Sequence, residues 1–300
     1  MVVRKLRRAG GADAAPVTAA VVAAAVAVTG LGGCTGAVDA RPPAGAVVTA
    51  GGPVGDAGGR GGDGAGRGRG AEALRAAADA LARAGTSKAR TSMEMTTGGT
   101  RLTVHGEGGY DFRARRGRVQ VLLPEDGGRP QRRITQVFTP GALYMKNRGA
   151  GVPADKWVRV DTATLADGNL VTGGATDPAA AAELLRAARR VAFVGSARLG
   201  GVRVAHYRGT TDIAAAAKTA SPQVRGALAA AAKGFATDAV AFDAYLDDEG
   251  RLRKVRHRFR VTNGGREVGV ASTTELYDFG TPVGVELPPR RDIYAGRIEG

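Results

Sequence analysis

The chain has 300 residues, of which 43% are hydrophobic and only 5% aromatic. Its 43 Lys and Arg against 28 Asp and Glu give a formal net charge of +15, which favours contact with anionic partners such as lipid, cell-wall polymer or nucleic acid. The single cysteine, Cys34, excludes an intramolecular disulfide and any zinc site built on several cysteines.

The first 33 residues have the pattern of an export signal. Basic residues lie between positions 4 and 8, and an alanine-rich apolar run follows from Ala14 to Gly33. A basic start, an apolar stretch and small residues at its end are typical of such signals. The run is of borderline length for a membrane span, which needs about 20 apolar residues, so an uncleaved anchor is the alternative.

The lone thiol ends this run. Leu31-Gly32-Gly33-Cys34 resembles the lipobox of bacterial lipoproteins, in which Leu stands three residues before an obligatory Cys with small residues between them. The resemblance implies attachment of diacylglycerol to Cys34 Sγ and cleavage between Gly33 and Cys34. Acylation with two chains gives stable membrane anchoring. We therefore expect a lipid-anchored protein on the extracytoplasmic face of the cell membrane; a chance match is the other reading.

A tether is expected between Cys34 and the folded domain. Residues 41–70 contain 12 glycines and three prolines. Such a composition cannot bury enough apolar surface to offset its backbone entropy. The sequence thus divides into a signal peptide (1–33), a lipidated Cys and disordered tether (34–70) and one domain (71–300).

The first half of the domain opens with a helix at 71–84, which Gly85 ends. Period-two alternation then predicts strands at 100–112, 116–124, 132–140, 142–147 and 156–160, with a turn at Pro140-Gly141.

The second half opens with a helix over 176–190, for which Asp177 is a natural N-cap and Pro178 suits the first helical position. Arg186, Arg189 and Arg190 are expected at its C-terminal end. Strands follow at 191–199 and 202–213, helices at 213–233, a hairpin around 247–250 and a last strand at 267–279. Strand meanders broken by helices predict an antiparallel α+β domain, with the helices on one face of a curved sheet.

Several segments in order resemble the LolA/LolB-like lipoprotein-carrier superfamily, and especially its LppX/LprG-like lipoproteins. The segments are "SKARTSMEM", "GEGGYDF", "LYMKN", "KWVRVD", "DPAAAAELLRAARR", "AHYRGTTDI", "FDAYLDDEGRLRK" and "ELYDFGTPVGVELPP". The resemblance spans roughly residues 71–289. It implies a half-barrel, a curved antiparallel sheet packed around helices, with an apolar cavity that can hold acyl chains.

The concave face of such a sheet would draw on apolar residues at alternate positions. A dry apolar groove binds an acyl chain strongly, because each buried CH₂ contributes about 0.8 kcal/mol. The alternative is an ordinary filled core. The candidate cavity residues are Val119, Val121, Leu123, Leu143, Met145, Val158, Val160, Phe242, Ala244 and Leu246.

The strand near residue 256 carries a basic row. Alternation places Lys254, Arg256, Arg258 and Arg260 on one face, and Val255, His257, Phe259 and Val261 on the other. The row could contact phospholipid headgroups or wall polymer; the alternative is a solvated strand face.

Catalytic motifs are weak. His105, His206 and His257 lack metal-ligand spacing, no GxSxG motif occurs, and Asp247-Asp248-Glu249 is interpreted as a hairpin turn rather than a carboxylate site. We expect no metal, no cofactor and no enzymatic activity, with a hydrolase least favoured.

The resulting expectation is a membrane-anchored lipoprotein that binds lipid or lipidated protein cargo. The alternative is an envelope sensor or scaffold of the same fold with no lipid cargo. A monomer is expected, without nucleic-acid binding.

Overall fold

The computed structural model describes residues 62–124, 131–146, 151–235, 237, 239–263 and 266–295. The expected signal peptide, Cys34 and most of the expected tether lie outside these residues. Within the described ranges, every helix is too short or too polar to cross a bilayer.

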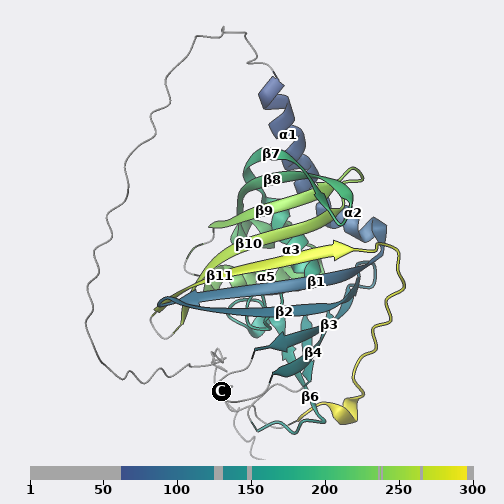
Figure 1. Cartoon of the computed structure of the whole chain (residues 1–300). Helices are drawn as coiled ribbons and strands as arrows, with labels where there is room; N and C mark the ends of the chain where they lie inside the picture. Colours follow the sequence, from purple (N-terminus) through teal and green to yellow (C-terminus); the bar gives the residue numbers. More distant parts are fainter. Residues whose placement is uncertain are drawn as a thin grey trace, which may run out of the picture.

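Eleven strands form one antiparallel sheet, in the order β6-β5-β4-β3-β2-β1-β11-β10-β9-β8-β7. Two meanders, β1 to β6 and β7 to β11, meet in the middle where the first and last strands pair. The sheet is curved, and α3 and α5 lie behind it in the view of Figure 1. The predicted α+β architecture of a curved antiparallel sheet around helices is therefore confirmed. The strands are β1 (Thr86–Thr97), β2 (Thr100–Asp111), β3 (Arg116–Leu123), β4 (Arg132–Thr139), β5 (Ala142–Lys146), β6 (Trp157–Asp161), β7 (Arg189–Leu199), β8 (Val202–Asp212), β9 (Ala239–Asp247), β10 (Leu252–Asn263) and β11 (Arg266–Tyr277).

The first helix begins earlier than the sequence predicts. Helix α1 covers Gly62–Arg75 and α2 covers Ala77–Ala84, whereas the composition predicts order only from Ala71. The end of α1 packs closely on β8, because a Cβ at Gly70 would lie only 2.6 Å from the ring of Tyr207. Such tertiary packing provides most of a helix's stability in proteins, and it outweighs the poor helix propensity of glycine here.

The helix after β6 is shorter than predicted. Helix α3 covers Pro178–Leu184, with the Asp177 cap and the Pro178 start as expected, and the 3-10 turn η2 follows at Leu185–Ala187. Arg189 and Arg190 belong to β7 and do not extend the helix, which corrects the expectation for these two residues. The reason is that the carbonyl of Leu184 accepts a hydrogen bond from Thr211 of β8, so the chain turns into the sheet.

Helices cover the concave face in two groups. One buried apolar cluster lies under α1, α2 and α3. A second lies under α4 (Ile213–Thr219) and α5 (Pro222–Gly234). The predicted hairpin turn is present, since Asp247 accepts hydrogen bonds from the backbone N–H of Glu249 and Arg251.

Candidate functional site

The apolar positions expected on the concave face lie together beneath the helices. Most of them belong to a single buried cluster, where their exposed fractions are 0–6%. Leu123 and Val160 pack against the margin of that cluster. The buried members are Val119, Val121, Leu143, Met145, Val158, Phe242, Ala244 and Leu246.

Helical side chains complete this interface. Leu74 of α1, Leu81 of α2 and Leu185 of η2 belong to the same cluster and are fully buried. Full burial of one such side chain contributes about 1.5–3 kcal/mol. An acyl chain would replace these contacts, so its entry requires the helices to move away from the sheet.

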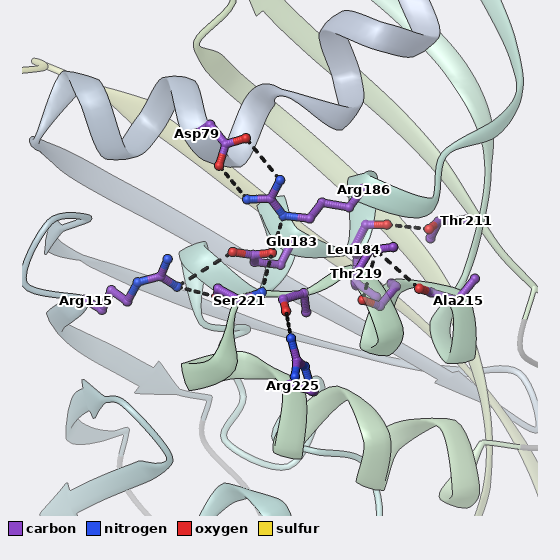
Figure 2. A network of polar contacts seen from close by, with 12 residues as sticks. Asp79, Arg115, Glu183, Leu184, Arg186, Thr211, Ala215, Thr219, Ser221 and Arg225 are labelled. Atoms are coloured by element: carbon purple, nitrogen blue, oxygen red, sulfur yellow. Dashed lines mark hydrogen bonds and ion pairs between the residues drawn. The ribbon is translucent and has the colours of Figure 1, made fainter.

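An ionic clasp joins the helices that cover the interface (Figure 2). Arg186 of η2 donates from Nε to Glu183 Oε2 at 2.5 Å, and its two terminal nitrogens donate to Asp79 of α2 at 2.6 and 3.1 Å. The hydrogen bond from Arg186 lowers the pKa of the Asp79 carboxyl, and the same bond raises the pKa of Arg186. The clasp therefore links α2 to α3.

Glu183 is the buried centre of the clasp. Its side chain is 2% exposed, and a second cation, Arg115 of the β2–β3 turn, lies 3.6 Å from Oε1. Arg115 also donates to Ser221 Oγ at 2.5 Å, and the backbone N–H of Ser221 donates to Glu183 at 3.3 Å. The clasp thus reaches the start of α5. The sequence offered one signal for it, the i,i+3 spacing of Glu183 and Arg186.

A polar pocket lies at the start of α3. The Asp177 carboxylate accepts a hydrogen bond from the Ala179 N–H at 2.8 Å and another from the Tyr110 hydroxyl. Burial raises the pKa of Asp177 from 3.8 to about 6, against these hydrogen bonds, which lower it. The pocket measures about 30 Å³ and is also lined by Asn169. That volume suits one or two water molecules and is too small for an acyl chain.

The basic row lies on the outer face of the sheet, opposite the buried His257 and Phe259. The alternation predicted along this strand is therefore present. Each member of the row forms an ion pair with a carboxylate on the sheet. The pairs are Lys254–Glu275 at 2.7 Å, Arg256–Glu94 at 3.2 Å, Arg258–Asp243 at 2.7 Å and Arg260–Glu267 at 3.4 Å.

The histidines do not come together. His257 is buried between the rings of Phe242 and Phe259, and burial alone lowers its pKa from 6.5 to about 3. His206 instead bonds Asp243 at 2.8 Å on the outer face. In the described ranges, no group of three or more His, Cys, Asp or Glu is arranged to hold a metal ion. Cys34 and Gly33, the expected lipidation and cleavage residues, lie outside those ranges.

The fold and the site together define an α+β domain. Its open antiparallel sheet packs against helices, and an apolar interface lies between the sheet and the helices. No protein-family model matches the chain, and no curated protein matches it. Similar solved structures include LprF from Mycobacterium bovis, at 11% identity and a TM-score of 0.38, with 74% of this chain and 97% of that chain covered. Another is the Mycobacterium tuberculosis lipoprotein LppX, at 11% identity and a TM-score of 0.42, with 72% and 99% covered.

A domain of an outer membrane lipoprotein-sorting protein from Vibrio parahaemolyticus is also similar, at 11% identity and a TM-score of 0.30, with 71% of this chain and 95% of that domain covered. These proteins include the lipoprotein group that the sequence resembles. At such low values the likeness carries no argument about the site, which rests on the contacts described above.

Proposed function

We propose that the protein is a membrane-anchored, extracytoplasmic lipoprotein that binds lipid or lipidated cargo between its sheet and its helices, without catalysis. The observation that carries this proposal is the continuous apolar interface between the concave sheet face and α1, α2 and η2. Cys34 supplies the anchor through its diacylglyceryl group, and the Gly-rich segment after it serves as the tether.

The energetics suit reversible binding. Burial of a twelve-carbon chain yields about 10 kcal/mol, at about 0.8 kcal/mol for each CH₂. Lifting Leu74, Leu81 and Leu185 from the sheet costs about 5–9 kcal/mol by the same measure, before any loss of the clasp. The two terms are of similar size, so cargo exchanges with the helical contacts instead of binding irreversibly.

The same close packing favours a second candidate, an envelope sensor or scaffold with a permanently filled core. The cluster residues are already 0–6% exposed, and the helical leucines are fully buried. In that case a protein partner, and not an acyl chain, is the ligand.

Mass spectrometry of the protein after gentle extraction distinguishes the two. Co-purifying acyl lipid supports the carrier, and its consistent absence favours the scaffold. A fluorescent fatty-acyl probe adds a kinetic test: Arg186→Met, which opens the clasp, should take up the probe faster than wild type, whereas Arg159→Met on the exposed face of β6 should not. No uptake by either variant contradicts a cargo-binding interface.

The anchor has its own test, independent of cargo. Cys34→Ser should release the protein from the membrane fraction and remove the mass of the lipid from the intact chain. A variant that stays membrane-bound with unchanged mass contradicts lipidation at Cys34 and favours an uncleaved anchor.

A further inference from the structure

The outer face of the sheet carries an open groove of about 550 Å³. It lies on β1, β2, β9, β10 and β11, where the basic row stands on the outer face of the sheet, and Phe259 and Val270 of the second buried cluster also contribute to its lining. Ligand sites commonly have volumes of about 300–1,000 Å³. The groove is therefore large enough for a small ligand.

Strand register explains why the surface is hollow there. Arg258 pairs with Ala241 on one side and Ala271 on the other. Arg260 pairs with Gly269, which in turn pairs with Thr96. The arginines thus stand among some of the smallest side chains on the face, and the floor of the groove is formed by Ala239, Ala241, Gly269 and Ala271.

The groove carries a net positive charge. Four arginines and one glutamate line it: Arg101, Arg256, Arg258, Arg260 and Glu94. Asp243 and Glu267 pair with Arg258 and Arg260, so the four arginines face three carboxylates and a formal charge of +1 remains. Arg101 lies at the start of β2 and pairs with Thr96 of β1. Strands lie about 4.8 Å apart, so the backbones of Arg101 and Arg260 are about 14 Å apart, across three strand spacings. Their long side chains face the same space from two sides.

Several of these cations keep donors available. Within the described ranges, Arg101 forms no ion pair. The Nε of Arg256 has no hydrogen-bond partner either, but it is buried, so Arg256 can reach a ligand only through its terminal nitrogens. The Arg260–Glu267 pair spans 3.4 Å between side chains that are 68% and 66% exposed, so it holds Arg260 only weakly. Arg258 is firmly engaged by Asp243 at 2.7 Å.

We propose that this groove binds a phosphate ester, whose oxygens accept hydrogen bonds from Arg101, Arg256 and Arg260. The planar fork of arginine suits phosphate oxygens, and several arginines that converge on one groove suit an anion with several oxygens better than a single carboxylate. Lys254, the fourth member of the basic row, takes no part because it lies outside the groove and pairs with Glu275. The site does not depend on the proposed lipid cargo, which binds on the other face.

Inorganic diphosphate is the probe. It carries several negative charges, and its length suits a groove that extends over two neighbouring cross-strand pairs, Arg258–Ala271 and Arg260–Gly269. Binding to residues 34–300 carrying Cys34→Ser is measured by calorimetry at low salt. Wild-type sequence should bind diphosphate more tightly than monophosphate. Arg101→Gln should weaken binding about ten-fold or more, the usual effect of losing a charged hydrogen bond.

A steric variant tests the groove without changing its charge. Gly269→Leu fills the floor, and its Cβ has room because the nearest atom, the carbonyl oxygen of Thr96, is 4.0 Å away. Binding should fall at least as far as in Arg101→Gln. The matched controls are Arg159→Gln on β6 and Gly284→Leu, where a Cβ meets nothing within 4 Å. Both should bind as wild type does, and no variant should unfold at a lower temperature than wild type.

The proposal is overturned if wild type does not bind diphosphate at millimolar concentration. It is equally overturned if Arg101→Gln and Gly269→Leu bind as tightly as their controls, because binding would then reflect only the net charge of the chain. Competition identifies the source of the ester: displacement of diphosphate by glycerol phosphate alone supports a soluble ester, and displacement also by anionic phospholipid vesicles supports a lipid headgroup. Displacement by neither refutes the site.

Discussion

Arg186→Met tests the ionic clasp that closes the helices over the apolar interface. The substitution keeps most of the apolar stem but removes the guanidinium that bonds Glu183 and Asp79. Glu183, only 2% exposed, then retains Arg115 at 3.6 Å and the Ser221 N–H at 3.3 Å. Removal of one partner from a buried ion pair costs about 3–5 kcal/mol, and the remaining partners place this case near 3 kcal/mol.

The measurement is urea unfolding at pH 7, followed by circular dichroism. In thermal unfolding of a domain of this size, the same loss of about 3 kcal/mol in the free energy of unfolding would lower the melting temperature by about 6–12 °C. Asp79→Asn is the matched comparison, because the Asp79 side chain is 55% exposed and exposed pairs contribute about 1 kcal/mol or less. Both single variants disturb the hydrogen bonds between Arg186 and Asp79, but only Arg186→Met also removes the bond to Glu183 and leaves a buried carboxylate poorly compensated.

The double variant Glu183→Gln with Arg186→Met isolates the cause. Without a charge at residue 183, the loss of Arg186 should cost far less than it does in the single variant, since removal of both charges leaves no unpaired buried ion. If Arg186→Met costs no more than Asp79→Asn, or if the double variant loses the sum of the single losses, the buried charge of Glu183 does not hold the clasp together.

Two further predictions concern pH. The pKa of His257 is about 3 in the folded chain, against an ordinary value of 6.5. The unfolded chain therefore binds a proton that the folded chain does not, and the free energy of unfolding falls as the pH drops below 6.5. His257→Phe should lessen this loss, measured as a smaller change in the urea midpoint between pH 7 and 4.5. The pKa of Asp177 is raised from 3.8 to about 6, so its destabilising effect grows as the pH rises from 3.8 through 6. Asp177→Asn, which can still cap α3, should therefore gain up to about 3 kcal/mol over wild type between pH 4 and 7, and a difference that does not change with pH contradicts the burial of this carboxylate.

Local patterns predicted the faces of the strands well. Alternation along residues 251–261 placed His257 and Phe259 on the opposite face from Arg258 and Arg260, and the structure agrees, because a strand has a side-chain period of two wherever it lies in a sheet. The Asp177 cap was predictable for a similar reason, since it depends on neighbours within three residues.

Contacts between distant segments could not be predicted in this way. Arg186 bonds Asp79 across 107 residues, and Arg256 bonds Glu94 across 162 residues. After β6 the chain crosses to the opposite edge of the sheet and forms β7 there. The second meander then runs inward until β11 lies beside β1, and both contacts depend on this crossing. The candidate cavity residues were found as a set because each is apolar on its own strand. Helical spacing also places Leu74 and Leu81 on one apolar stripe, but only the fold shows that this stripe covers the candidate cavity residues.

In the outer groove, the stability of the domain and the binding of diphosphate are expected to conflict. Gly and Ala are poor strand formers, yet Gly269 and Ala271 stand on the solvent face, where packing does not require them. Gly269→Thr should therefore stabilise the domain by about 1 kcal/mol, because threonine favours extended backbone and glycine loses more entropy on folding. Its side chain would enter the groove and weaken diphosphate binding, measured by calorimetry beside urea unfolding. A variant that is more stable and binds equally well would show that the floor of the groove does not bound the ligand.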